Sequence, residues 1–467
     1  MLKSINSPII RQYAVVLIVN ICVFTTGMNL AWPSPMLVKL TNETQTILPR
    51  TITEEEGSWI VSVEFLFAFI FNYLMAILLD SLGRKYCVLL GCVPKTIGVF
   101  LYIFATDVWM LILGRLLFGL ADSFVFIGVS IYASEVATKN TRGASCSLTQ
   151  MFSSLGIVMT LSAGPFLSYL TFNIVFAVII IATSIPVLFL PETPYYLYNK
   201  GRENEAIKVL EFLHGSEILA KQEIEEYTMS KKSEIINKMA ILKNPVVRKI
   251  FPISITFVIG AQLVGYNAVS YYLQTILIST GTTIMPEIAS VIIGIIQFVS
   301  SFLTPFTTDR YGRKVIFLTT LIGMMLGMVG LGTFFQLKPS DGVLVPGFLN
   351  YLPLISLILV VYCYNAGVGS LLLVVTAELF DGPARAFGVS ITLAVNTTMI
   401  FLTTKYFPML LSKVGPAITY WSFGGVCILM CLFIMFCLPE TKGKSFVEIQ
   451  GVFSKKKNED KHFSTAL

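Results

Sequence analysis

Charge is scarce in this chain. Asp, Glu, Lys and Arg make up only 13% of the 467 residues, whereas a soluble domain carries about 25%. Apolar residues make up 55%, and the mean hydropathy is +0.77. An apolar surplus of this size would leave a soluble bundle of this length insoluble. The composition therefore predicts a membrane protein.

Metal-binding and disulfide patterns are also lacking. The two histidines, His214 and His462, both lie in polar segments. The eight cysteines all fall in or next to apolar runs, and none forms a CxxC pair with zinc spacing. We therefore expect neither a metal centre nor a disulfide framework.

Enzyme signatures are missing as well. The sequence has no nucleophile elbow and no phosphate-binding GxxxxGK[ST] loop, so we expect no enzyme activity, no cofactor and no ATP-driven transport by this chain. Many lysines flank the apolar runs, where they can contact anionic lipid headgroups. Nucleic-acid binding is therefore not needed to explain them. The expected partners are the lipid bilayer and a small molecule, and no obligate protein partner is evident.

Long apolar runs dominate what is present. A membrane-spanning helix needs roughly 20 apolar residues, and twelve runs meet this need. They lie near 14–36, 57–79, 86–105, 107–133, 145–168, 171–190, 250–278, 285–307, 315–336, 348–376, 386–410 and 416–438. The chain thus divides into a six-helix half (1–190), a polar linker with short amphipathic helices (191–249), a second half (250–438) and a tail (439–467).

The distribution of positive charge predicts the orientation. With both termini inside, 26 of the 33 Lys and Arg residues fall in inner segments, and cytoplasmic loops are rich in these residues. Both termini are therefore expected in the cytoplasm. The first outer loop then contains a glycosylation sequon at Asn42.

Three charged motifs occur twice, in the same order and at the same membrane face, which indicates a duplicated six-helix unit. The fold class is therefore an all-α membrane protein with twelve transmembrane helices in two pseudo-symmetric halves. The pairs are Asp80-Ser81-Leu82-Gly83-Arg84-Lys85 with Asp309-Arg310-Tyr311-Gly312-Arg313-Lys314, Glu135…Arg142 with Glu378…Arg385, and Pro191-Glu192-Thr193 with Pro439-Glu440-Thr441.

These loops can form ion pairs between neighbouring helices while an inner gate is closed. The simpler alternative is that the positive charges of these loops only set the membrane topology. That alternative does not explain why the loops also contain carboxylates and glycines. We also expect Arg115 to join the network, because an unpaired arginine is costly in lipid. The predicted gating set is Asp80, Arg84, Arg115, Glu135, Arg142, Asp309, Arg313, Glu378 and Arg385.

At these motifs the chain resembles the sugar porter family of the major facilitator superfamily. The repeated loops and the segment Tyr266-Asn267-Ala268-Val269-Ser270-Tyr271-Tyr272 carry the resemblance, which covers nearly the whole chain. Within the family, the chain resembles the insect facilitated trehalose transporters and the facilitative glucose transporters. The likeness to the trehalose transporters lies in the short tails, in Gly57-Ser58-Trp59 and in the region of Gln297. The resemblance implies passive transport of a sugar, trehalose or a hexose such as glucose.

The resemblance also implies a substrate site and an outer gate. Amides suit a sugar because they both donate and accept hydrogen bonds. The alternative for each amide is that it only joins helices. The family positions that bind sugar are matched by Gln150, Gln262, Asn267, Gln297 and Asn396, and the outer-gate pair by Tyr271 and Tyr272. Gly265 is expected to break the helix beside this site.

Two departures keep other substrates open. The family has a Gly-Pro-x-Pro-Trp run at the position of segment 367–373, which in this chain contains neither proline nor tryptophan. The family also has a tryptophan at the position where this chain has Thr397. These residues normally contact the sugar and seal the inner gate. A carrier of another organic solute, such as a polyol or plant metabolite, and a non-transporting sugar sensor therefore remain alternatives.

Coupling to protons requires a titratable group that reaches the cavity. Proton-coupled members of the family have an aspartate where this chain has Asn29, which favours a passive carrier. The expected location is the plasma membrane. Glu64 and Asp122 are the carboxylates inside the spans, and Lys95 is the expected countercharge for either.

Overall fold

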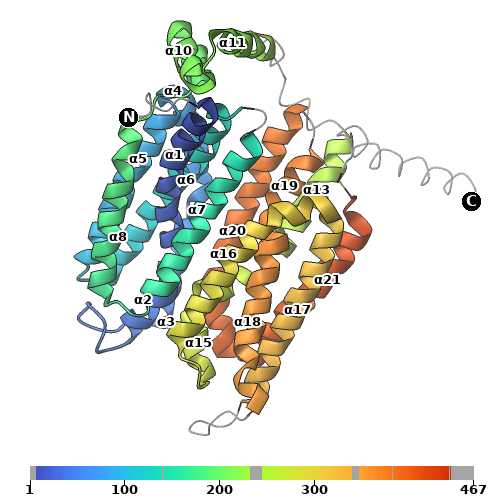
Figure 1. Cartoon of the computed structure of the whole chain (residues 1–467). Helices are drawn as coiled ribbons and strands as arrows, with labels where there is room; N and C mark the ends of the chain where they lie inside the picture. The colour runs from blue at the N-terminus through green and yellow to red at the C-terminus, as the bar shows by residue number, and fades with distance from the viewer. Residues whose placement is uncertain are drawn as a thin grey trace, which may run out of the picture. The chain divides into compact units, whose positions relative to one another are not determined.

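The computed structural model describes residues 7–138, 141–231, 245–338, 347–380, 382–440 and 442 (Figure 1). Every regular element among these residues is a helix. The chain divides into two compact units, Met1–Ile235 and Ile236–Leu467. The finer division into a linker and a tail stays a prediction.

The first unit packs long helices side by side. Gly83 and the segment 104–107 make two of the turns between them. The helices are α1 (Pro8–Ala31), α2 (Pro33–Thr41), α3 (Glu54–Leu66), α4 (Ala68–Leu82), α5 (Arg84–Ile103), α6 (Val108–Val136), α7 (Arg142–Ala163), α8 (Tyr169–Ser184), η2 (Pro186–Phe189), α9 (Pro194–Asn199), α10 (Glu203–His214) and α11 (Glu217–Lys231).

The second unit repeats this pattern of long helices. It contains a π-helical turn, η4 (Tyr364–Val368), between α18 and α19. The helices are α13 (Pro245–Leu263), α14 (Tyr266–Tyr271), α15 (Leu273–Thr280), α16 (Pro286–Tyr311), α17 (Arg313–Leu337), η3 (Gly347–Asn350), α18 (Leu352–Cys363), α19 (Gly369–Leu379), α20 (Gly382–Val414) and α21 (Pro416–Cys437).

Helices occupy all twelve predicted runs. Within the described residues, eleven are long and apolar enough to cross a membrane. The remaining predicted span, 145–168, coincides with α7, whose apolar part Leu148–Ala163 is shorter. The all-helical fold class is confirmed, and α7 accounts for the difference from the predicted count.

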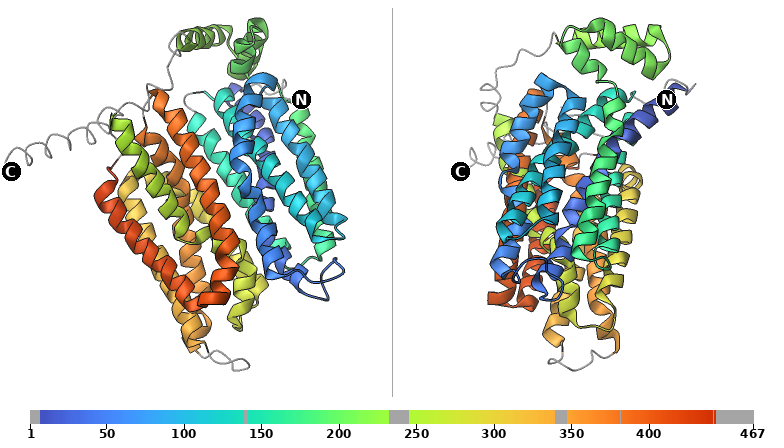
Figure 2. Two further views of the ribbon diagram at one scale, coloured as in Figure 1. Left: turned by 180° about the vertical axis from the view of Figure 1, so that it is seen from behind. Right: turned by 90° about the vertical axis from the view of Figure 1, so that its left-hand side faces the viewer.

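Three short helices follow η2 in the first unit. α9, α10 and α11 share a small core that includes Leu197, Leu210 and Ile224. α10 lies at the end of the unit where α1 begins (Figure 2). There Arg11 Nη1 donates to Phe212 O at 3.0 Å and Gln12 Nε2 donates to Leu213 O at 3.1 Å.

Candidate functional site

The predicted helix break lies at Gly265. α13 ends at Leu263 and α14 begins at Tyr266, with Gly265 between them at φ +86°. L-residues rarely adopt this left-handed conformation, whereas glycine does so without steric cost. A Cβ at this position would also lie 2.4 Å from Phe423 Cδ2. Glycine thus allows the turn and the close packing against α21.

Three predicted site residues meet beside this break. Gln262 Nε2 donates to Asn396 Oδ1 of α20 at 2.6 Å, and Asn267 Nδ2 donates to Gln262 Oε1 at 2.5 Å. Gln262 is buried, whereas Asn267 and Asn396 are partly exposed. Within the described residues, these amides form a connected cluster that keeps two members accessible.

Aromatic side chains adjoin the amides, and the sequence reasoning missed them. The Tyr364 phenol of η4 interacts with Gln262 and Asn267. Its ring stacks on Tyr266 with 3.6 Å between centroids and an interplanar angle of 7°. Asn365 Nδ2 donates to the Tyr266 hydroxyl at 3.1 Å. An available signal was the polar, aromatic pair Tyr364-Asn365 inside an otherwise apolar run.

Both residues of that pair lie in a π-helical turn. π turns are rare and occur frequently at functional sites. This one, Tyr364–Val368, overlaps the segment that departs from the sugar porter pattern. The irregular turn thus includes the first two residues of that segment, Gly367 and Val368.

The two remaining predicted amides lie on other helices. Gln297 on α16 is 5% exposed, and Gln150 on α7 is exposed. Neither side chain has a described hydrogen bond to the cluster. Their roles in binding stay predictions.

The predicted outer-gate tyrosines are both buried. The Tyr272 hydroxyl donates to Thr404 O of α20 at 3.3 Å, and its ring centroid lies 5.4 Å from that of Phe407. Tyr272 therefore joins the end of α14 to α20. Gating by Tyr271 and Tyr272 stays a prediction.

The first unit contains a buried cluster of charges. Arg115 Nη2 lies 2.6 Å from Glu64 Oε2, and Lys95 Nζ lies 2.9 Å from Asp122 Oδ1. Asn29 Nδ2 joins the pairs, because it donates to Glu64 Oε2 at 3.1 Å and to Asp122 Oδ2 at 2.8 Å. Each buried charge thus faces an opposite charge, as burial requires.

This arrangement corrects the expectation for Arg115. Its described partners are Glu64, Asn29 Oδ1 at 2.7 Å and Ile60 O at 3.0 Å, rather than the charged loops. The reason is position, because Arg115 lies in the second turn of α6 and the loop carboxylate Glu135 lies at the opposite end of that helix. Lys95 pairs with Asp122, one of the two carboxylates anticipated for it.

The repeated loops form ion pairs between neighbouring helices in both units. Arg84 on α5 lies 3.0 Å from Glu135 on α6, and Arg313 on α17 lies 3.1 Å from Glu378 on α19. Asp80 is exposed and lies 3.6 Å from Arg84. These pairs agree with the expected pairing, and their role in holding a gate closed stays a prediction.

The Pro-Glu-Thr motif of the first unit caps a helix. Glu192 Oε1 accepts from the backbone N–H groups of Arg84 at 3.1 Å and Lys85 at 3.2 Å, at the start of α5. The N-cap residue is Gly83, which has no side chain that could accept these hydrogen bonds. A carboxylate here also favours the positive end of the helix dipole. Burial raises the pKa of the Glu192 carboxyl above its ordinary value.

The second unit repeats this cap. Glu440 Oε1 accepts from Arg313 N at 3.1 Å and Glu440 Oε2 from Lys314 N at 2.9 Å, at the start of α17. The N-cap is again a glycine, Gly312, at φ +87°. The duplicated motif therefore has a structural role in each unit that the sequence reasoning did not assign.

Four predicted residues remain. The side chains of Arg142, Asp309 and Arg385 lie outside the described residues. Asn42 is exposed, and its Oδ1 accepts from Thr44 N at 3.0 Å and Thr44 Oγ1 at 2.8 Å. Glycosylation of Asn42 stays a prediction.

Comparison with known proteins adds a family match. Residues 15–453 match the family described as sugar (and other) transporters. The chain is 28% identical over 446 residues to the facilitated trehalose transporter Tret1 of Polypedilum vanderplanki, covering 95% of this chain and 88% of that protein. It is 29% identical over 443 residues to a Tret1-2 homolog of Drosophila simulans, covering 94% and 90%.

Solved structures share the fold. The inward open xylose transporter XylE from E. coli superposes with a TM-score of 0.78 at 20% identity, covering 94% of this chain and 99% of that one. A peptide transporter, POT, superposes with a TM-score of 0.62 at 14% identity, covering 90% and 93%. This fold therefore serves carriers of different substrates.

Proposed function

The chain belongs to the family of sugar (and other) transporters, and from that premise we propose that it moves trehalose or a hexose such as glucose passively across the plasma membrane. Transport proceeds by alternating access, in which the bound sugar is exposed to one side of the membrane at a time. Both termini lie in the cytoplasm. The named relatives, facilitated trehalose transporters, support the choice of sugar.

The observation that carries this proposal is the amide cluster of Gln262, Asn267 and Asn396 beside the break at Gly265. A sugar presents neutral hydroxyl groups that both donate and accept. Amide groups match this pattern because each has an acceptor oxygen and a donor nitrogen. The stacked pair Tyr266 and Tyr364 supplies aromatic surface at the same place.

Passive transport is supported by the charge cluster of the first unit. Proton coupling needs a carboxylate that exchanges its proton during the cycle. Glu64 instead pairs with Arg115, and Asp122 pairs with Lys95. The amide Asn29 lies between the two carboxylates. Both carboxylates therefore serve to stabilise the unit rather than to carry protons.

A second candidate is a carrier of another organic solute, such as a polyol. The segment 367–373, which lacks the usual prolines and tryptophan, favours it. Purified protein in sealed lipid vesicles separates the two functions by uptake of labelled trehalose, glucose and mannitol. We expect saturable uptake of a sugar to its external concentration without an ion gradient. Saturable uptake of mannitol alone would contradict the sugar assignment.

A further inference from the structure

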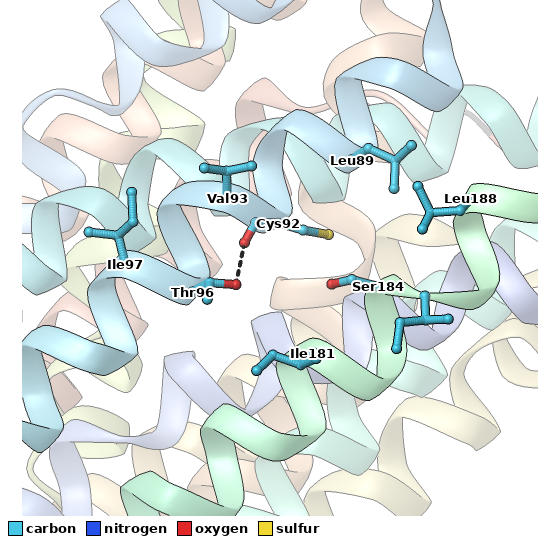
Figure 3. Close-up of a pocket in the computed structure, with 9 residues that line it drawn as sticks. Leu89, Cys92, Val93, Thr96, Ile97, Ile181, Ser184 and Leu188 are labelled. Atoms are coloured by element: carbon cyan, nitrogen blue, oxygen red, sulfur yellow. Dashed lines mark hydrogen bonds between the residues drawn. The ribbon is translucent and has the colours of Figure 1, made fainter.

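An open groove runs between two helices of the first unit. It has a volume of about 490 Å³ and lies between α5 and the segment formed by α8 and η2 (Figure 3). Five of its lining residues lie between Leu89 and Ile97, and four lie between Ile181 and Leu188. On both walls they follow the i, i+3, i+4, i+7 pattern, so each wall is one face of a helix. The groove is open to the surroundings, because Val93 and Ile185 at its edge are 53% and 51% exposed.

The lining of this groove suits an apolar occupant. Cys92 and Ser184 lie on opposite walls and are smaller than the leucines and isoleucines beside them (Figure 3). The hydroxyls of Ser184 and Thr96 donate to carbonyl oxygens of their own helices, at 2.7 Å and 2.9 Å, as does the Cys92 thiol at 3.4 Å. Serine and threonine often make this local bond within a helix. The polar groups of the groove therefore need no hydrogen bond from an occupant.

The position of the groove along the helices matches one leaflet of a bilayer. Both walls belong to helices that are long and apolar enough to cross a membrane, Arg84–Ile103 and Tyr169–Phe189. Exposed apolar side chains on such helices face lipid acyl chains. From Leu89 to Ile97, α5 rises about 12 Å, and one leaflet contributes about 15 Å of hydrocarbon. An acyl chain of one leaflet can thus lie along the groove.

A lysine lies at one end of the groove. Lys85 precedes Leu89 by one helical turn, and its Nζ donates at 2.8 Å to the backbone oxygen of Leu188, which is a lining residue. In the orientation proposed above, this end faces the cytoplasm. Among the described residues Lys85 Nζ forms no ion pair, whereas its neighbour Arg84 is paired with Glu135. An ammonium group has three N–H donors, so donors remain for an anionic group at this end.

We propose that the groove binds a phospholipid of the cytoplasmic leaflet with an anionic headgroup, such as phosphatidylserine. One acyl chain lies along the groove, and the headgroup contacts Lys85 Nζ. Basic sites between membrane-spanning helices on the cytoplasmic side are suited to anionic headgroups. A sterol is also apolar, but its neutral hydroxyl leaves the charge of Lys85 unmatched. The site is separate from the amide cluster, and the proposal goes beyond the transport of a sugar.

The test places the full chain in vesicles of phosphatidylcholine that contain a small fraction of phosphatidylserine with a diazirine in its acyl chain. Illumination links this probe to adjacent residues, which mass spectrometry of the digested protein identifies. Phosphatidylcholine with the same diazirine chain is the comparison probe. We expect phosphatidylserine to label segments 89–97 and 181–188 roughly fivefold more than phosphatidylcholine, as one lysine near the membrane surface allows.

Two outcomes of this labelling would overturn the proposal. Equal labelling of the groove by the two probes would show ordinary lipid contact without headgroup selection. Loss of the phosphatidylserine label on addition of cholesterol, but not on addition of unlabelled phosphatidylserine, would assign the groove to a sterol. Neither result depends on which solute the chain transports.

Two variants separate the charge from the groove. Lys85→Gln should lower the phosphatidylserine labelling to the phosphatidylcholine level, whereas Ser184→Leu fills the groove and should lower labelling by both probes. Lys314→Gln is the matched control, because Lys314 Nζ likewise donates to Met435 O at 2.7 Å in the second unit, and it should label this groove as the wild type does. A phosphatidylserine preference that persists in Lys85→Gln, or wild-type labelling in Ser184→Leu, would contradict the proposal. A single symmetric gel-filtration peak for each variant verifies folding.

Discussion

The Gln262 side chain donates a hydrogen bond to Asn396 across 2.6 Å and accepts one from Asn267. This buried amide therefore connects the helix before the break at Gly265, the short helix after it, and α20. A sugar that binds here replaces or adds to hydrogen bonds that the amides already make. Its affinity thus depends on both partly exposed partners, Asn267 and Asn396.

Asn267→Ala tests the cluster directly. The substitution removes the Asn267 donor to Gln262 and an accessible amide, so sugar affinity should fall. Loss of one hydrogen bond costs about 1 kcal/mol, which corresponds to a rise in KM of roughly fivefold to tenfold. Uptake kinetics measured with surface biotinylation separate affinity from expression. Thr398→Ala on the exposed side of α20 is the control, and unchanged kinetics in Asn267→Ala would remove this segment from the site.

Tyr364→Phe tests the aromatic neighbour. The change deletes the hydroxyl that interacts with Gln262 and Asn267 but keeps the ring that stacks on Tyr266. We expect normal expression and a KM raised roughly threefold to tenfold, because about 1 kcal/mol of hydrogen bonding is lost. Tyr364→Leu also removes the stack and should have the larger effect. Equal kinetics in all three proteins would show that η4 does not line the site.

Glu64→Ala tests the charge cluster. Arg115 is fully buried and Glu64 is its nearest carboxylate, at 2.6 Å. Removing one partner of a buried ion pair destabilises a protein by about 3–5 kcal/mol, because a charge remains buried without compensation. We expect a clear drop in the thermal unfolding temperature of the purified protein. Glu205→Ala, which breaks the exposed pair with Arg202, should leave that temperature unchanged, and an equal effect of the two variants would refute the assignment.

Glu192→Ala tests the helix cap of the first unit. Two backbone N–H groups at the start of α5 lose their acceptor, and loss of an N-terminal cap costs about 1 kcal/mol. Glu192→Gln keeps an acceptor oxygen, and burial already raises the pKa of this carboxyl, so a neutral side chain should be tolerated. Thermal unfolding should therefore rank wild type and Glu192→Gln above Glu192→Ala. Glu440→Ala should reproduce the loss at α17, and stability of both alanine variants equal to wild type would contradict the capping role.

The helical spans and the break at Gly265 could be predicted because they depend on local sequence, namely apolar length and the backbone freedom of glycine. The amide cluster could be predicted in part, since Gln262, Asn267 and Asn396 lie at positions that the family resemblance names. Tyr364 was not predicted, although the pair Tyr364-Asn365 was an available signal, because its contacts with the amides depend on how η4 packs in the tertiary fold. The partner of Arg115 escaped as well, because the choice of a carboxylate depends on which helices lie side by side.

The capping carboxylates show a further limit of prediction from the sequence. Glu192 and Glu440 were recognised as repeated residues, but a duplicated motif does not say what it binds. Each carboxylate lies more than 100 residues from the helix it caps, with separations of 108 and 127 residues to Arg84 and Arg313. Contacts of such separation follow from the tertiary fold rather than from spacing along the chain.

The central claim is passive sugar transport, and uptake of radiolabelled trehalose and glucose into oocytes that express the full chain tests it most directly. Uptake is measured at mildly acidic and at neutral outer pH, with surface expression quantified in the same cells. The account predicts saturable uptake of at least one sugar with the same rate at both pH values, because Glu64 and Asp122 are paired with Arg115 and Lys95. Strong stimulation by acid would contradict passive transport, and no uptake of either sugar from surface-expressed protein would contradict the sugar assignment.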